Sequence, residues 1–154
     1  MLTQSKLTIR YACRADCPPL ALLDRLANPD TCWSEEEFQA FLACHNSAIY
    51  LAEECGELAG FLCLSATMEG EQPHTEIESL GVNPVYQRRG VGTRLVSHLS
   101  KKGYPIRAYV NEYHLPIQLF FRKLGFTVES TIGFRGLADT YIFTLPGGEV
   151  CGGR

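Results

Sequence analysis

Residues 79–99 read SLGVNPVYQRRGVGTRLVSHL, the most informative segment of the chain. An alternating strand ends at Val82, a turn with two consecutive arginines follows, and an amphipathic helix begins at Gly90. Gly90 and Gly92 allow neighbouring backbone N–H groups to converge at the positive end of the helix dipole. A strand, a glycine-containing turn and a helix in this order predict a binding site for a pyrophosphate.

The same residues exclude two other phosphate-binding loops. The G-x-G-x-x-G loop of dinucleotide-binding folds needs a third glycine where this chain has Leu95, and the G-x-x-x-x-G-K-[ST] pattern is absent. In the alternative interpretation, Arg88, Arg89 and Arg94 only form a solvated face. The two glycines favour the phosphate site over that alternative.

The rest of the chain alternates strand and helix patterns without a linker or an internal repeat. Strands are predicted over residues 7–12, 48–53, 58–68, 74–82, 106–110, 126–132 and 140–145. Helices are predicted over residues 18–26, from residue 35 onward, over 90–101 and over 116–124. This order predicts a single mixed α/β domain over residues 1–145, followed by a flexible tail over 146–154.

Two local patterns sharpen this assignment. Ser34 and Glu37 form an S-x-x-E capping box, with Trp33 and Phe38 placed as a hydrophobic staple, so a structural role for Trp33 is favoured over substrate binding. In the strand over 74–82, a period of two would place Glu76, Glu78, Leu80 and Val82 on one face.

The formal net charge of −3 is unevenly distributed. Residues 1–78 carry 13 acidic and 4 basic side chains, residues 79–111 carry 6 basic and no acidic ones, and residues 112–154 carry 4 of each. A nucleic-acid partner is not expected, because a basic face would lie beside an acidic half of the chain. A local anionic ligand at residues 79–111 fits this distribution.

The composition also bears on location and on metals. No stretch approaches the roughly 18 apolar residues of a membrane span, and Lys6, Arg10 and Arg14 interrupt the N-terminus. We therefore expect a cytoplasmic protein without a membrane partner. The seven cysteines form no CxxC pair and only four histidines accompany them, so reduced thiols and no metal site are expected.

The chain resembles the GNAT superfamily of acyl-CoA N-acyltransferases in two motifs. The first, V-x-P-x-(Y)-[QR]-[RG]-x-G-[IV]-[GA], is matched by Val82, Pro84, Tyr86, Gln87, Arg88, Gly90, Val91 and Gly92. The second, ending [LF]-[YF]-x-K-x-G-F, is matched by Phe120, Phe121, Lys123, Gly125 and Phe126. The resemblance covers most of the chain. It implies a single-domain GNAT-like α/β fold, with a mixed central sheet of about seven strands and helices on both faces.

The resemblance implies acetyl-CoA as co-substrate. Its pantetheine arm would pair with the backbone of Leu80 and Val82 where neighbouring strands separate, and its pyrophosphate would bind the amides of residues 88–93. The implied cofactor-binding residues are Leu80, Val82, Gln87, Arg88, Arg89, Gly90, Val91, Gly92, Thr93, Asn111, Phe121 and Lys123. The lack of carboxylates over residues 79–111 then has a physical reason, because they would repel a polyanionic ligand.

The chemistry implied is direct attack of a neutral amine on the acetyl thioester, which requires removal of a proton from an ammonium. Glu76 stands where several family members carry a general base, and Glu78 lies two residues further along. Either could act through water. The alternative is that both are solvent-facing strand residues or salt-bridge partners.

The chain departs from the family at the general acid. Phe121 stands where the family carries a tyrosine and has no proton to donate. A thiol with a pKa of about 8.5 leaves tolerably without a dedicated acid. Tyr113 is the first substitute candidate for catalysis, followed by Tyr109 and Tyr141.

Residues 33–38, WSEEEF, are similar to those of the ribosomal-protein alanine N-acetyltransferases, which acetylate a protein N-terminus. However, Tyr109, Phe121 and His114 stand where that subgroup carries Glu, Tyr and Asn, so its acceptor is not assigned to this chain. His114 could contact the cofactor, act as a base, or simply be an exposed residue at a helix start.

Two functions follow from these observations. The first is an N-acetyltransferase, monomeric or homodimeric, acting on a primary amine of a small molecule or a peptide N-terminus. The acidic first half favours a cationic acceptor. The second is a sensor or regulatory module that binds CoA without catalysis, which the loss of a tyrosine at Phe121 would suit.

Overall fold

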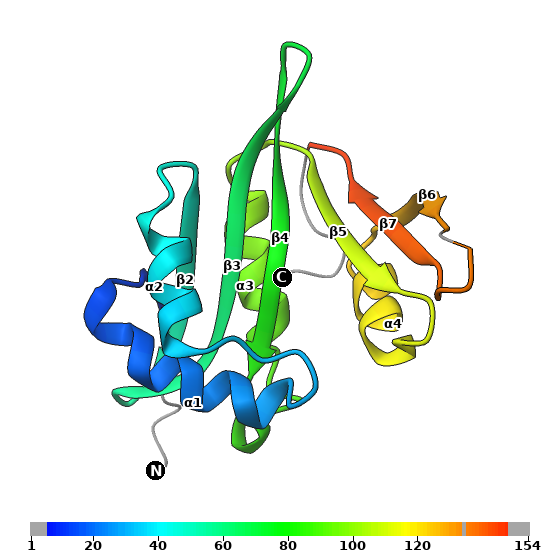
Figure 1. The fold of residues 1–154 in the computed structure, drawn as a ribbon. Coiled ribbons are helices and arrows are strands. Elements are labelled where there is room, and N and C mark those ends of the chain that lie inside the picture. The colour runs from blue at the N-terminus through cyan, green and yellow to red at the C-terminus, as the bar shows by residue number, and fades with distance from the viewer. Residues whose placement is uncertain (1–5, 134, 148–154) are drawn as a thin grey trace.

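A seven-stranded mixed sheet forms the centre of the computed structural model, which describes residues 6–133 and 135–147 (Figure 1). The strands are β1 (Leu7–Tyr11), β2 (Ser47–Glu54), β3 (Glu57–Glu69), β4 (Gln72–Val82), β5 (Ile106–Asn111), β6 (Thr127–Ile132) and β7 (Thr140–Leu145). Their order in the sheet is β1-β2-β3-β4-β5-β7-β6, in which β4 and β5 are parallel and the other pairs antiparallel. The predicted mixed sheet of about seven strands is confirmed.

Two pairs of helices cover opposite faces of this sheet (Figure 1). They are α1 (Cys17–Ala27) and α2 (Glu35–Ala43) on one face, and α3 (Val91–Ser100) and α4 (Leu115–Lys123) on the other. Short 3-10 helices lie at Arg14–Asp16 and Pro84–Tyr86. The larger core cluster packs α3 and α4 against the sheet, and the smaller one packs α1 and α2.

Local sequence signals account for the helix boundaries. The Ser34 hydroxyl accepts a hydrogen bond from the Glu37 amide at 3.1 Å, and α2 begins at Glu35 as predicted. The Trp33 and Phe38 ring centroids are 5.3 Å apart, which confirms their packing across the cap. Proline at the start of α1 and α4 removes an N–H that would have no helical acceptor.

The hydrophobic faces of α3 and α4 meet in the larger cluster. Val91, Leu95 and Leu99 are almost fully buried on α3, and Phe121 is 2% exposed on α4. The i, i+4 spacing read from the sequence therefore positions the start of α3 directly beside the sheet.

Within the described residues, no helix is both long and apolar enough to cross a lipid bilayer. Of the predicted tail, only Pro146 and Gly147 lie within the described part of the chain, so the prediction of flexibility for the remaining seven residues falls outside it. The limits of the domain at residues 1–145 stay a prediction.

Candidate active site

Strands β4 and β5 separate partway along their length, and a cavity of about 330 Å³ opens between them. Their parallel pairing covers only Thr75–Ile77 and Ile106–Ala108, whereas β5 pairs with β7 through Asn111. The cavity is lined by Asn28, Thr31, Ile77, Glu78, Ser79, Leu80, Ala108, Tyr109, Val110, Asn111, His114, Ile117 and Phe121. Figure 1 shows the two strands diverging toward the end where α3 begins. Beyond Ile77, the edge of β4 that faces β5 is free of strand pairing.

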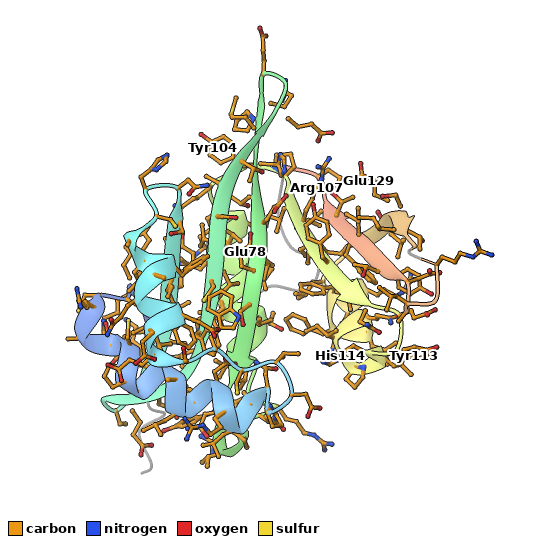
Figure 2. All side chains as sticks on the ribbon, viewed as in Figure 1. Glu78, Tyr104, Arg107, Tyr113, His114 and Glu129 are labelled. Carbon is orange, nitrogen blue, oxygen red and sulfur yellow. The ribbon has the colours of Figure 1, made fainter. Side chains whose placement is uncertain are left out.

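A β-bulge in β4 marks the point of separation. The register between β3 and β4 shifts between Cys63 and Leu64, so that Glu78 has no partner residue on β3. A bulge of this kind interrupts the alternation of side chains and bends the strand. Glu78 lines the cavity and is exposed, so it marks where the cavity opens to solvent, here called its mouth; Figure 2 labels Glu78 on β4.

The bulge overturns one sequence prediction. Glu76, Glu78, Leu80 and Val82 do not share a face: the Ser65 hydroxyl donates to the Glu78 carboxylate on the α1 and α2 side. Leu80 and Val82 instead pack against the cluster on the α3 and α4 side. The extra residue at the bulge, Glu78, breaks the period of two. The sequence contains no signal for this bulge.

The two carboxylates have different surroundings. Glu78 borders the cavity, and its Oε1 is 2.6 Å from the Ser65 hydroxyl. The Glu76 Oε1 accepts a hydrogen bond from the Tyr109 hydroxyl at 3.1 Å and lies 3.5 Å from the His74 Nε2. Glu78 is thus presented directly to a ligand in the cavity, whereas Glu76 reaches it through Tyr109.

The turn before α3 has the geometry of an anion site. Gly90 has a left-handed φ of 76° and no side chain that could accept from the first amides of α3. Arg88 also has a positive φ, of 64°, so consecutive amides turn inward. A Cβ at Gly92 would lie 3.2 Å from the Phe120 ring, so glycine permits the close approach of α3 and α4. The free amides at this helix start suit a phosphate group.

Side chains of the preceding segment hold this turn in place. The Tyr86 hydroxyl donates to the Glu57 carboxylate at 2.5 Å, and this bond raises the pKa of Tyr86 to about 12. The Asn83 Oδ1 accepts from the Val85 amide at 3.2 Å. The turn is therefore anchored to the β2–β3 hairpin.

The basic side chains around the turn point in different directions. Arg89 pairs with the Glu54 carboxylate at 3.3 Å, and Arg94 approaches the Leu7 carbonyl oxygen at 3.5 Å. Together with Lys6, these two arginines line a second cavity beside β1. Arg88, Lys123, Gln87 and Thr93 belong to the set predicted to bind the cofactor, and the first three are exposed.

Comparison with known proteins identifies the family to which this chain belongs. The model of the acetyltransferase (GNAT) family matches residues 19–126, which contain the separated strands, the turn and α4. The chain belongs to the acetyltransferase (GNAT) family. It is therefore an acyl-CoA acetyltransferase, as the two sequence motifs predicted.

Individual relatives agree with this assignment. A 5-NmdU N-acetyltransferase of Pseudomonas phage PaMx11 is 29% identical over 104 residues, or 66% of this chain and 73% of that protein. The ribosomal-protein-S18-alanine N-acetyltransferase from Escherichia coli superposes with a TM-score of 0.77 at 22% identity, over 93% of this chain and 95% of that one. Arabidopsis thaliana NAA60 in complex with acetyl-CoA gives a TM-score of 0.76 at 18% identity, over 91% and 99%. The structural likeness confirms the GNAT fold.

The GNAT family's second motif contributes Phe121 to the lining of the cavity. The Phe121 ring packs against Phe126 and Phe143, with centroids 4.9 and 6.0 Å away, and it lines the cavity without offering a hydroxyl. Tyr113 is 80% exposed beside a neighbouring cavity at α4 (Figure 2). Tyr109 lines the cavity between the strands, whereas Tyr113, the first candidate from the sequence, lines the neighbouring one.

Two further residues of this GNAT site join the two cavities. Asn111 and His114 line both of them, and the His114 Nδ1 accepts from the Ile117 amide at 3.4 Å as the cap of α4. The Asn111 Oδ1 accepts from the Tyr113 amide at 2.9 Å. Among the described residues, His, Cys, Asp and Glu form no group of three that could hold a metal ion.

The contacts that hold the α1–α2 loop in place beside the cavity were not predicted from the sequence. Asp24 is fully buried on α1 and accepts from the Trp33 amide and the Asn28 side-chain amide, both at 2.8 Å. The Asn28 amide also donates to the Leu80 carbonyl oxygen at 3.1 Å. A carboxylate next to Leu23, on the buried face of α1, was the available signal.

We expect Asp24→Ala to destabilise the fold by about 2–4 kcal/mol, because two part-buried donors lose a fully buried charged acceptor. For a chain of this length this lowers the thermal midpoint by about 5–10 °C. Asp30→Ala, in the same loop but exposed, is the control for differential scanning calorimetry. Equal midpoints for the two variants would contradict the role given to Asp24.

Proposed function

We propose that this GNAT enzyme transfers the acetyl group of acetyl-CoA to a primary amine by direct attack of the amine on the thioester. The observation that carries the proposal is the position of Glu78. Its carboxylate borders a cavity that runs between separated strands, and the start of α3 offers the amides of residues 91–93, which have no acceptor within the helix. A proton acceptor and an anion site at one split in the sheet suit an acyl-CoA substrate and an amine.

The backbone of β4 fits a pantetheine arm. The Leu80 carbonyl oxygen accepts from Asn28 rather than from β3, so the polar groups of Leu80 face the free edge of the strand. Val82, two residues further, repeats this orientation. Both residues can therefore hydrogen-bond an amide-containing chain lying in the separation.

The phosphates of acetyl-CoA fit the turn before α3. The amides of Val91, Gly92 and Thr93 would hold the pyrophosphate, together with those of Arg88 and Gly90. The exposed guanidinium of Arg88 and ammonium of Lys123 can add charge. The Arg89 side chain is engaged by Glu54, so the contribution proposed for Arg89 is that of its backbone.

Glu78 is the proposed general base. It would accept a proton from the acceptor's ammonium, directly or through one water, while the Ser65 hydroxyl fixes one carboxylate oxygen. Its mouth position leaves the other oxygen accessible from solvent.

The charge around the mouth supports a cationic acceptor. Glu69, Glu76, Glu78 and Glu129 lie on or beside this face, and Arg107 is already paired with Glu69 and with Glu129 (Figure 2). The remaining carboxylates produce a negative field that attracts an ammonium. A peptide N-terminus and a small polyamine both satisfy this requirement.

Release of free CoA thiol, dependent on an added amine, tests the function. The panel contains polyamines, aminoglycosides, amino acids, short peptides and 5-NmdU, the last because of the phage relative's name. Turnover with cationic amines is the expected result, and turnover confined to neutral or acidic acceptors would contradict the charge argument. Tight acetyl-CoA binding without turnover across the panel would instead support the non-catalytic CoA-binding module.

A further inference from the structure

A chain of polar contacts leads from the cavity into the sheet. The Tyr109 hydroxyl on β5 is 3.1 Å from the Glu76 Oε1 on β4, which lies 3.5 Å from the His74 Nε2. The His74 Nε2 is in turn 2.6 Å from the Thr67 hydroxyl on β3. His74 is only 6% exposed, so the buried end of this series of contacts is held in place.

The neighbouring cation does not compete for Glu76. Arg107 is the residue opposite Glu76 in the β4–β5 pairing, but its guanidinium is held by Glu69 and Glu129. The Glu76 carboxylate is therefore left to its contacts with Tyr109 and His74. Glu78, the other titratable group near Tyr109 on this face, is bonded to Ser65.

Amine acetylation ends with a proton on the sulfur, and a donor placed there speeds departure of the thiolate. When an ammonium becomes an amide, its nitrogen loses two protons, and the departing thiolate takes up one. The hydroxyl groups bordering the described part of the cavity belong to Thr31, Ser79 and Tyr109. Of these, a phenol is by far the most acidic, and Phe121 offers no proton.

Tyr109 is suited to hold its proton until it is needed. Burial and the adjacent Glu76 carboxylate raise the pKa of Tyr109 above its ordinary value. The hydroxyl is therefore protonated at neutral pH, and its hydrogen bond to Glu76 gives a direct route for replacing the proton.

We propose that Tyr109 is the general acid of the reaction and that Glu76 returns its proton. This assignment rests on the proposed function. Glu78 takes the first proton from the ammonium and releases it to solvent. As the nitrogen–carbon bond forms and the carbon–sulfur bond breaks, Glu78 takes the second proton from nitrogen and later releases it to solvent. Tyr109 gives its own proton to sulfur and is reprotonated through Glu76 by a proton from solvent, so the products are the amide and the free thiol.

Tyr109→Phe tests this role with the ring packing preserved. We expect kcat to fall about 100-fold, the usual contribution of an acid, with the affinity for acetyl-CoA unchanged. Glu76→Gln should produce a similar loss, and the double variant should lose little more, because both residues serve one proton transfer. Tyr104→Phe is the matched control: Tyr104 lies in the α3–β5 connection, outside the cavity, and kcat should stay the same (Figure 2).

A second measurement does not depend on turnover. The thiolate absorbance of bound CoA is titrated against pH, with the complex of desulfo-CoA subtracted to remove tyrosine absorbance. A hydrogen bond from Tyr109 to sulfur stabilises the thiolate, so Tyr109→Phe should show about tenfold less thiolate at a given pH. Tyr104→Phe should match the unmodified enzyme.

The outcomes separate this proposal from the proposed function. Absence of amine-dependent turnover in the unmodified enzyme would overturn the function, while the thiol titration would still test Tyr109. Normal kcat and a normal titration in Tyr109→Phe would overturn the acid assignment and leave the function standing. A loss in Tyr113→Phe instead would transfer the role to Tyr113.

Discussion

Gly90→Glu is expected to weaken acetyl-CoA binding about 1000-fold. Gly90 has a φ of 76° at the start of α3, where the proposed pyrophosphate would lie. A carboxylate about 4 Å from a phosphate charge costs about 4 kcal/mol at an effective dielectric constant of 20, which corresponds to roughly three orders of magnitude in affinity. Isothermal titration calorimetry with acetyl-CoA measures this loss.

The control must separate charge from backbone strain. A side chain in the left-handed region costs about 1–2 kcal/mol wherever it occurs. Gly103, just beyond the other end of α3, has a φ of 79°, and a Cβ added there, as at Gly90, would meet no atom within 4 Å, so Gly103→Glu carries the same strain far from the turn. We expect both variants to lose similar thermal stability and only Gly90→Glu to lose binding. Micromolar affinity in Gly90→Glu would remove the phosphate assignment of this turn.

The sequence predicts the backbone conformation correctly where a single residue type determines it. Ser34 predicts the start of α2, and Pro84 and Gly90 bound the turn before α3, because caps, prolines and positive φ values are properties of single residues. The same holds for the proposed phosphate site, which would be built mostly from backbone amides of consecutive residues. The residues of such a site are neighbours in the sequence, so a local pattern can predict them.

The parts of the site that depend on strand pairing were not predictable in this way. The bulge at Glu78 arises from the register of β3 against β4. After the bulge, the side chains of β4 lie on the opposite face of the sheet from the one that the sequence period predicts. Tyr109 was ranked below Tyr113 because only the β4–β5 pairing brings its hydroxyl to Glu76. Asp24 likewise reaches Trp33 and Asn28 through the fold of the α1–α2 loop.

The uneven charge also has a spatial interpretation. Residues 79–111 carry no carboxylate, and they supply both the turn before α3 and the free edge of β4 beyond the bulge. Glu76 and Glu78 end the acidic part of the chain, at the level where the strands separate. The boundary between the two charge regions therefore coincides with the point where a thioester bound along β4 would meet an incoming amine.

Glu78→Gln is expected to lower kcat about 100-fold at neutral pH, because the amide cannot accept the acceptor's proton. The side chain keeps its shape, and its carbonyl oxygen can still accept from Ser65, so the affinity for acetyl-CoA should not change. An alkyl ammonium has a pKa of about 10.4 and needs a base below that pH. The defect should therefore shrink as pH rises toward this value, since solvent then supplies neutral amine.

Measurement of kcat against pH, from neutral to about pH 10, tests this dependence on the acceptor's pKa. Glu71→Gln is the control, since Glu71 is exposed in the β3–β4 hairpin at the end of the sheet away from the turn before α3 (Figure 1). It should retain the unmodified profile. If Glu78→Gln lowers kcat by the same factor at every pH, Glu78 acts in positioning the substrate. If kcat is unchanged, the first proton leaves through Glu76 or directly to water, and Glu78 serves only to attract the cation.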